Sequence, residues 1–352
     1  MLSPRQLRSN LLVKLGEITG RTHVLPIVLF APTARCNSRC VSCDWWRADG
    51  ASDLTLDEIR RLASELPRFG TRLVVLTGGE PLFRADVIDV ADAFLTQGLR
   101  LHLLTSGLAL ERFAGEIVGR FEEVTVSLDG HTPELYREIR GVSGLAAVEG
   151  GVRALRALAP SMLIRARSTI HRRNFRALPG IVAKAREMGF SQLSFLAADV
   201  TSDTFNRRSL PRSDSGPAGP SNLLLDADEV AELASVVETV IRLHARELAD
   251  GVVLPGPDGL RRLVQYYRAH LGGGAFPEVD CNAPWASVVI EADGAVRPCF
   301  FHRPVGNLRE QGLSGILSSA MPAFRRALDV ATNEIYQHCV CTLKIGFRST
   351  LP

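Results

Sequence analysis

The first two hundred residues alternate between two hydrophobic patterns, short apolar runs and stripes with helical spacing. The apolar runs predict strands at residues 26–32, 72–77, 100–105, 123–128, 162–170 and 191–198. The helix-spaced stripes between them predict helices near residues 55–68, 84–97, 109–120, 144–158 and 176–188. Strands that alternate with helices form parallel sheets joined by crossover helices. We therefore expect an α/β fold over residues 23–200.

Local features within this pattern support the prediction. Residues 73–76 (LVVL) are apolar at every position, as in strands whose two faces are both buried. Thr55 precedes Glu58 by three residues, which is the spacing of a capping box. In such a box the two side chains satisfy each other's backbone N–H groups, so we expect a helix to begin there.

The alternation stops after residue 200. Residues 201–222 are rich in Gly, Pro and Ser, a composition typical of loops. Helices are predicted next at 226–247 and 257–271, followed by a glycine linker at 272–274. In the last segment, residues 288–296 alternate around an Asp-Gly pair, which is the strongest short hairpin signal.

These changes of pattern predict four parts. They are an N-terminal helix (1–22), the α/β core (23–200), a loop and helical insertion or linker (201–275) and a small C-terminal domain with a β-hairpin (276–352).

Composition and charge narrow the class of protein. The 352 residues are 46% hydrophobic and 22% charged, as in ordinary globular proteins. A net charge of +3 gives no case for a nucleic-acid partner, which requires a basic face. No apolar run approaches the roughly 20 residues that cross a bilayer. Residues 1–20 lack the apolar core of a signal peptide, and we expect an amphipathic helix packed on the protein body without membrane contact.

Without an export signal we expect a cytoplasmic protein. In that reducing compartment the seven cysteines are metal ligands or catalytic thiols rather than disulfides.

Three cysteines, Cys36, Cys40 and Cys43, follow the first predicted strand with C-x3-C-x2-C spacing. A 4Fe–4S cluster bound by cysteine alone takes four thiolates, so three thiolates leave one iron open for a small molecule. A zinc ion with a distant fourth ligand is the alternative. The loop lies beyond the carboxyl end of a strand, where α/β folds bind their ligands.

Gly78, Gly79 and Glu80 follow the second predicted strand. Two glycines let a ligand approach the backbone closely, and the carboxylate can accept hydrogen bonds from an ammonium group. Taken alone, the Gly-Gly-Glu motif is equally consistent with an ordinary strand-to-helix turn. One strand after the cysteine triplet, it indicates a ligand site.

The cysteine triplet and the Gly-Gly-Glu turn together resemble the radical S-adenosylmethionine (SAM) superfamily. The resemblance implies a partial (β/α)6 barrel and a 4Fe–4S cluster on the three cysteines, with the amino and carboxylate groups of SAM chelating its open iron. It also implies that the Gly-Gly-Glu turn contacts the SAM amino group. The residue before the third cysteine is usually aromatic in this family, and here it is Ser42. Trp45 and Trp46 lie just beyond, where they either cover the adenine or belong to the core.

Two further residues match family positions that contact the cofactor. Ser127 ends the fourth predicted strand, where polar groups bind the ribose or carboxylate of SAM; capping of the next turn is the alternative. Arg167 resembles a fifth-strand arginine that pairs with the SAM carboxylate, a task for which a guanidinium is well suited. A solvated, outward-facing arginine is its alternative. Arg140-Gly141 is also family-like, and we expect it to form a structural turn.

The C-terminal segment holds the other four cysteines, Cys281, Cys299, Cys339 and Cys341. The C-x12-G-x4-C spacing around Gly294 resembles the auxiliary-cluster domains of the SPASM and twitch subfamilies and implies a second 4Fe–4S cluster. Four thiolates saturate such a cluster and make it an electron carrier, and they fit the one-cluster twitch form. Zinc is again the alternative. His302 and His338 lie near these cysteines, and we expect neither to bind metal.

The resemblance also implies a reaction. An electron from a donor such as flavodoxin or ferredoxin would cleave SAM, and the 5'-deoxyadenosyl radical would take a hydrogen atom from a substrate. Three plus four ligands use all seven cysteines, so no thiol is left to return a hydrogen atom. We therefore expect net oxidation, by dehydrogenation or bond formation, although a tyrosine donor would undo this argument.

The substrate class is open between a small molecule of a biosynthetic pathway and a ribosomally made peptide that is crosslinked or epimerised. About 25 residues precede the first strand, too few for the leader-binding module of many peptide modifiers, which favours the small molecule. A non-enzymatic iron–sulfur carrier or scaffold is the remaining alternative. A carrier needs no amino-acid-binding turn, so the Gly-Gly-Glu turn argues against it.

Overall fold

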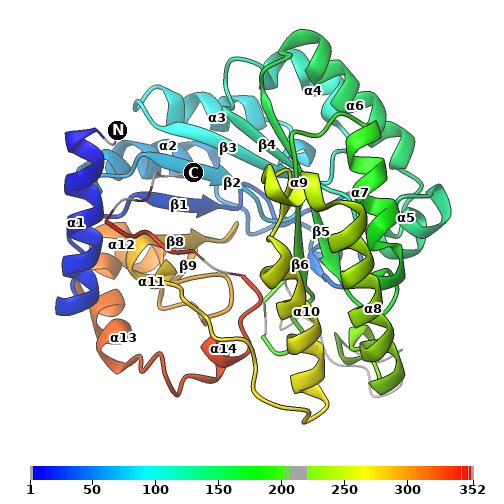
Figure 1. The fold of residues 1–352 in the computed structure, drawn as a ribbon. Helices are drawn as coiled ribbons and strands as arrows, with labels where there is room; N and C mark the ends of the chain where they lie inside the picture. The colour runs from blue at the N-terminus through cyan, green and yellow to red at the C-terminus, as the bar shows by residue number, and fades with distance from the viewer. Residues whose placement is uncertain (1–2, 203, 206–219, 342, 348, 350–352) are drawn as a thin grey trace. The chain divides into compact units, whose positions relative to one another are not determined.

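A computed structural model describes residues 3–202, 204–205, 220–341, 343–347 and 349 (Figure 1). The chain divides into two compact units. The first comprises residues 1–36, 47–103 and 279–352, and the second comprises residues 37–46 and 104–278. Most of the loop predicted at 201–222 lies outside the described residues.

A largely parallel sheet forms the centre of the first unit. In spatial order its strands are β10 (Gly306–Asn307), β9 (Ala295–Arg297), β8 (Ser287–Ile290), β1 (Ile27–Phe30), β2 (Leu73–Leu76) and β3 (Arg100–Thr105). Strands β8, β1, β2 and β3 are parallel (Figure 1). Strand β9 pairs antiparallel with both β8 and β10. Strand β3 ends in the second unit, to which its last two residues belong.

Helices complete the first unit. They are α1 (Pro4–Thr19), α2 (Leu56–Glu65), α3 (Val87–Leu95), α11 (Ala283–Ala286), α12 (Leu308–Gly315), α13 (Met321–Ala327) and α14 (Glu334–Gln337). Short turns of other helical types are η2 (Leu66–Phe69), η3 (Pro81–Phe83) and η6 (Ile316–Ala320), and η1 (Trp45–Arg47) crosses from one unit to the other.

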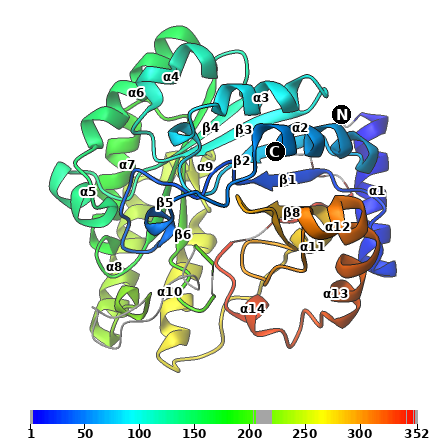
Figure 2. The same cartoon turned by 180° about the vertical axis from the view of Figure 1, so that it is seen from behind.

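The second unit contains a second set of parallel strands, β4 (Glu123–Ser127), β5 (Leu163–Ile170), β6 (Gln192–Ala197) and β7 (Val253–Leu254), paired in that order. Its helices are α4 (Leu110–Ile117), α5 (Pro133–Arg140), α6 (Leu145–Leu158), α7 (Leu178–Glu187), α8 (Ala227–Leu243), α9 (Ala245–Ala249) and α10 (Pro257–His270), with turns η4 (Phe175–Ala177) and η5 (Pro220–Leu223). Helices α8 and α10 pack against each other (Figure 2).

One face of β5 is buried and the other is partly open. Every second residue, from Ile164 to Ile170, is buried, whereas the residues between them are partly exposed. Arg165, Arg167 and Thr169 therefore share the open face. In neither unit do the described strands close into a barrel, as expected for a partial barrel.

The predicted core strands are confirmed, each to within two residues at either end. The capping box is confirmed as well: Thr55 accepts the Glu58 N–H at 3.3 Å, and Glu58 accepts the Thr55 N–H at 2.8 Å. The single helix predicted at 226–247 is wrong, because non-helical backbone at His244 separates α8 from α9. Helix α5 was not predicted, although it buries one face through Tyr136 and Ile139.

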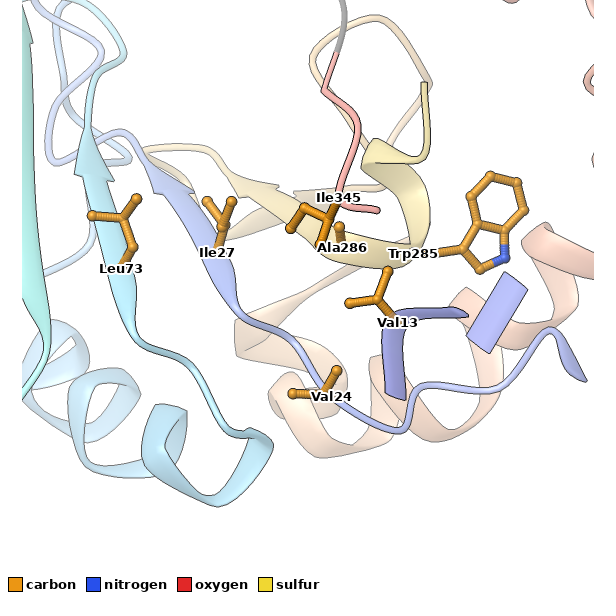
Figure 3. Packing of buried hydrophobic residues seen from close by; sticks show 7 residues of the cluster. All are labelled: Val13, Val24, Ile27, Leu73, Trp285, Ala286 and Ile345. Carbon is orange, nitrogen blue, oxygen red and sulfur yellow. The ribbon is translucent and has the colours of Figure 1, made fainter. Parts of the chain in front are cut away.

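The C-terminal hairpin is confirmed, but its first strand has a larger role than the sequence indicates. Strand β8 pairs parallel with β1, in the register Ile27 with Ser287 and Phe30 with Ile290. The C-terminal segment therefore extends the sheet of the first unit. Its core cluster joins both ends of the chain, and is formed by Val13, Val24, Ile27, Leu73, Trp285, Ala286 and Ile345 (Figure 3).

Helix α1 packs on the first unit, as predicted, but through its more polar side. Its buried residues are Ser9, Asn10, Val13 and Gly16. The Asn10 amide donates to the carbonyls of Phe347 and Ser349, at 3.2 and 2.9 Å. Leu12 packs beside Val13, whereas the other larger apolar residues form an exposed stripe: Leu7, Leu11, Leu15 and Ile18. None of the described helices has the length and apolar composition needed to cross a bilayer.

Arg309, at the start of α12, connects the C-terminal segment to α2. Its guanidinium donates to both Glu58 carboxylate oxygens, at 2.7 and 3.0 Å, and to the carbonyl of Ser52 at 3.0 Å. The hydrogen bond from Arg309 is the main reason that the pKa of Glu58 falls from 4.5 to about 2.

A pair of alanine variants tests the packing of α1. Val13 is 1% exposed, so Val13→Ala should lower the unfolding free energy by roughly 1–3 kcal/mol. Leu11 is 50% exposed, and Leu11→Ala should change the unfolding free energy by about 0.5 kcal/mol or less. Urea unfolding of both variants measures the difference. A larger cost for Leu11→Ala would show that the helix packs through the leucine stripe instead.

The Glu58–Arg309 pair predicts a pH-dependent term in stability. Because folding lowers the pKa of Glu58, the term is complete above about pH 4.5 and is lost as the pH falls toward about 2. Glu58→Gln removes the term, so the stability gap between wild type and variant should shrink by about 1 kcal/mol over that range, after allowance for solvent screening. Urea unfolding at pH 5, 3 and 2 tests this, and a gap independent of pH would contradict it.

Candidate functional site

The first cysteine triplet lies in the loop after β1, and each unit holds part of it. Cys36 ends the first segment of the first unit, whereas Cys40 and Cys43 belong to residues 37–46 of the second. All three are partly buried and free of disulfides. The Cys43 N–H donates to the Cys40 carbonyl at 3.3 Å, which gives the loop a tight turn between these two.

In the first unit, the loop that leads to Cys36 is interlocked with the Gly-Gly-Glu turn. The Gly79 N–H donates to the Thr33 carbonyl at 3.1 Å, and the Glu80 N–H donates to the Arg35 carbonyl at 2.8 Å. A Cβ on Gly79 would lie 2.2 Å from the Arg35 oxygen. A Cβ on Gly78, whose φ is +101°, would lie 2.5 Å from that of Ala31. Both glycines are therefore required by the close approach of the cysteine-bearing loop.

Glu80 is almost fully buried at 1% exposure. Its carboxylate accepts the Leu82 N–H at 3.1 Å at the start of η3. A buried carboxylate is costly unless it is paired, so this group is held in place by its neighbours and suits recognition of a cationic ligand group.

Polar side chains that the sequence did not single out hold the same loop from its other side. Asp53 accepts hydrogen bonds from the Thr33 hydroxyl at 2.5 Å and from the Ala34 N–H at 3.0 Å. Arg84 donates to the carbonyls of Pro32 and Leu54, at 2.6 and 2.8 Å. These residues line a surface hollow of about 370 Å³. Their contacts join loops distant in the chain, so no local signal could have found them.

Ser127 and Arg167 are brought together in the second unit. They are paired in register on the neighbouring strands β4 and β5. Arg167 is in turn the register partner of Ser194 on β6, and its Nε donates to the Ser194 hydroxyl at 3.2 Å. The three form a polar row across the sheet near its carboxyl edge. Arg167 thus lies on the partly open face rather than in bulk solvent.

The second part of the cysteine loop, residues 37–46, is held by α5. The Arg39 N–H donates to the Arg140 carbonyl at 2.8 Å, and the Val41 N–H donates to the Ile139 carbonyl at 3.0 Å. Gly141 ends α5 with a φ of +69°, and a Cβ there would lie 2.4 Å from the Arg39 oxygen. The structural turn predicted for Arg140-Gly141 is confirmed, and the same turn supports the cysteine loop.

The insertion contributes α10, whose tyrosines reach the carboxyl ends of β5 and β6. The Tyr267 hydroxyl donates to the Ile170 carbonyl at 2.5 Å, and the Tyr266 hydroxyl donates to the Ala198 carbonyl at 3.0 Å. This segment therefore lies at the edge of the second unit where α/β folds bind ligands.

The four C-terminal cysteines are brought together from three segments of the first unit. Cys281 precedes α11, Cys299 follows β9, and Cys339 and Cys341 follow α14. Burial, together with the neighbouring thiols, raises the pKa of Cys299 to about 12. The pKa of Cys341 is raised mainly by its interaction with Cys339 and then by burial. The four thiols thus lie within electrostatic range of one another, and the Cys339 thiol donates to the Cys341 carbonyl at 2.9 Å.

The surroundings of these thiols fit a thiolate-bound group. Cys281 Sγ accepts the Ala283 and Leu343 N–H groups, both at 3.4 Å. Cys299 accepts N–H groups from Phe301 and His302. Such bonds favour thiolate over thiol and tune iron–sulfur clusters. Among the described residues, no three His, Cys, Asp or Glu side chains converge on a point that a single metal ion would occupy.

His302 is buried beside this site at 3% exposure, and its Nε2 has no hydrogen-bond partner among the described residues. Its ring packs edge-on against Phe324, with centroids 4.8 Å apart. Burial lowers the pKa of His302 to about 4, so the ring is neutral. An orphaned ring nitrogen beside four thiols is a second feature that suits a bound group.

A glycine variant tests the interlock between the Gly-Gly-Glu turn and the cysteine loop. Gly79→Ala forces a Cβ against the Arg35 carbonyl and should lower the unfolding free energy by roughly 1–3 kcal/mol. The control is Gly115→Ala in α4, where nothing lies within 4 Å and the change should be neutral or stabilising by up to about 1 kcal/mol. Urea unfolding compares them, and equal effects would show that the loop does not press on Gly79.

Two family models match the chain. The radical SAM superfamily model matches residues 30–165, and the SPASM model, an iron–sulfur cluster-binding domain, matches residues 281–342. The first covers the cysteine triplet and the Gly-Gly-Glu turn, and the second covers all four C-terminal cysteines. Both 4Fe–4S clusters and SAM are the cofactors that these domains imply, which favours iron–sulfur over zinc at both sites.

The curated relatives match the chain over part of their length. A probable GTP 3',8-cyclase of Thermococcus kodakarensis is 37% identical over 135 residues, which are 37% of this chain and 44% of that protein. An AdoMet-dependent heme synthase of Methanosarcina barkeri is 30% identical over 176 residues, 48% of this chain and 49% of that protein. The chain thus spans about half or less of the length of these relatives.

Solved structures share the fold over nearly the whole chain. Streptococcus suis SuiB bound to S-adenosylmethionine superposes with a TM-score of 0.64 at 14% identity, covering 95% of this chain and 76% of SuiB. The anSMEcpe structure with bound AdoMet gives 0.59 at 16% identity, with 89% and 87% covered. This likeness confirms the partial-barrel fold with its C-terminal hairpin region. Residues 30–165 therefore form a radical SAM domain, and residues 281–342 form a SPASM iron–sulfur cluster-binding domain.

Proposed function

We propose that this radical SAM enzyme oxidises a small molecule in a biosynthetic pathway, and that the residues identified above carry its cofactors. Cys36, Cys40 and Cys43 hold the SAM-binding 4Fe–4S cluster. Gly78, Gly79 and Glu80 receive the amino group of SAM, and Ser127 and Arg167 bind its ribose and carboxylate. When bound, the cluster and SAM supply the 5'-deoxyadenosyl radical that removes a hydrogen atom from the substrate.

The interlock of Gly79 with the Arg35 carbonyl is the observation that carries this proposal. At this contact the Glu80 N–H donates to the Arg35 carbonyl at 2.8 Å. The hydrogen bond holds Glu80 next to the segment that leads to Cys36. A site that must bring an amino-acid ligand to an open iron requires these two groups in a constant relation. An electron carrier has no such requirement.

Cys281, Cys299, Cys339 and Cys341 are the proposed ligands of one auxiliary 4Fe–4S cluster, as in the twitch form. The use of every cysteine as a ligand leaves no thiol to return a hydrogen atom to the substrate. Of the four tyrosines, which are the alternative donors, Tyr266 and Tyr267 have hydroxyls engaged with backbone carbonyls. This supports net oxidation, with the auxiliary cluster as the electron acceptor.

The names of the relatives support a small-molecule substrate. The relatives with 30% identity or more include a GTP cyclase and a heme synthase. SuiB, whose structure with a precursor peptide is known, is only 12% identical and shares the fold. Peptide modification is therefore the second candidate. Residues 201–275 are proposed as the substrate-defining insertion between the core and the auxiliary domain, and a flavodoxin or ferredoxin in the cytoplasm is the proposed electron donor.

Anaerobic reconstitution tests the function. Purified chain with dithionite and SAM should release 5'-deoxyadenosine and methionine, and should bind about eight iron atoms. Cys40→Ala should retain about four iron atoms and release no 5'-deoxyadenosine, because it removes a ligand of the SAM-binding cluster. Cys299→Ala should also retain about four iron atoms. It should still cleave SAM, because it removes a ligand of the auxiliary cluster only. Wild type that binds iron without cleaving SAM would favour an electron carrier.

A further inference from the structure

Asp129 is a buried carboxylate just after β4 that accepts two hydrogen bonds from different parts of the second unit. It is 5% exposed and lies two residues beyond Ser127. Its Oδ1 accepts the backbone N–H of Thr169 at 2.8 Å, and its Oδ2 accepts Arg140 NH1 at 3.0 Å. The Arg140 side chain is partly buried, at 12% exposure.

Through Arg140, Asp129 reaches the cysteine loop. The carbonyls of Ile139 and Arg140, the last of α5, accept the N–H groups of Val41 and Arg39. These two residues flank Cys40 on either side. The position of Cys40 therefore depends on where α5 ends, and the Arg140 side chain anchors that end to Asp129.

Through Thr169, the same carboxylate reaches the polar row on the sheet. Thr169 lies two residues beyond Arg167 on the same face of β5. Asn174 closes the connection, because its amide donates to the carbonyls of both Asp129 and Thr169, each at 3.0 Å. The end of β5 is thereby attached to the turn after β4.

We propose that Asp129 is a positioning residue that sets Cys40 and Arg167 relative to each other, and with them the two ends of the SAM site. The inference rests on the proposed function, in which Cys40 binds the cluster and Arg167 binds the SAM carboxylate. Each oxygen of the carboxylate accepts one of the two hydrogen bonds, Oδ2 from Arg140 and Oδ1 from Thr169. An amide in its place can still accept from Thr169, but it leaves the partly buried Arg140 without its counter-ion, so the end of α5 must move.

The chain provides a matched control for this pair. Glu123 opens β4 and pairs with Arg165 on β5 at 3.0 Å, with the carboxylate side chain 10% exposed. It bridges the same two strands as Asp129 but lies at their other end. Glu123→Gln therefore reports what the loss of a partly buried ion pair does to the unit without altering the support of the cysteine loop.

The experiment compares Asp129→Asn with Glu123→Gln in the reconstituted full chain. Iron content, the thermal midpoint, the affinity for SAM and the change that SAM causes in the electron paramagnetic resonance signal of the reduced protein are measured. Asp129→Asn should weaken SAM binding by about 10- to 100-fold and abolish the spectral change, as losses of supporting residues around metal ligands do. Glu123→Gln should keep both, at a similar thermal midpoint.

Arg140 variants provide the second test and remain informative if Asp129→Asn fails to fold. Arg140→Met, which removes the anchor but keeps the carbonyl, should reproduce the weak SAM binding. Arg140→Lys, which keeps a cation beside Asp129, should recover most of the affinity. The inference would be overturned if both Asp129→Asn and Arg140→Met bound SAM with wild-type affinity, or if Glu123→Gln lost as much SAM affinity as Asp129→Asn. Either result would leave the proposed function standing. A wild type that binds neither iron nor SAM would overturn the proposed function and this inference with it.

Discussion

The close backbone contact between Gly79 and Arg35 is the constraint on which the arrangement of the Gly-Gly-Glu turn and the cysteine loop depends. Strands β1 and β2 are parallel neighbours, so the loops that follow them meet at the same edge of the sheet. The Arg35 carbonyl comes so close to Gly79 that a Cβ would lie 2.2 Å away. A residue with any side chain would separate the loops, and Glu80 would lose its hydrogen bond to the chain that enters the cysteine triplet.

Around this contact, buried polar groups rather than apolar packing determine the course of the cysteine loop. In the first unit, Asp53 accepts from Thr33 and Ala34. In the second, two carbonyls of α5 accept from the residues beside Cys40, and the Asp129–Arg140 pair anchors that helix end. A loop has no regular partner for its N–H groups, so each must be satisfied by a specific acceptor. Hydrogen bonds of this kind are directional, which suits a loop that must present three sulfurs in a set order.

The C-terminal segment belongs to the same framework as the first strands. Strand β8 lies in register on β1, and Arg309 connects α12 to α2. Four thiols then gather from three stretches of chain around Cys339, with backbone N–H groups directed at two of them. The hairpin positions Cys299, whereas the return of the chain after α14 supplies the last two cysteines. The auxiliary site thus requires the whole segment to be folded.

The sequence by itself determined the strands, the capping box, the cysteine sets and the Gly-Gly-Glu turn, because each depends on residues close together in the chain. Periodicity over a few residues shows which face is buried. The spacing of Cys36, Cys40 and Cys43 lies within eight residues and can be read without knowledge of the fold. Only the tertiary structure decided that α1 packs through Asn10 and Val13 while Leu7, Leu11 and Leu15 stay exposed, that β8 joins β1, and that Asp129 supports both Arg140 and Thr169. These depend on which distant backbone groups come within about 3 Å, and no local pattern encodes that distance.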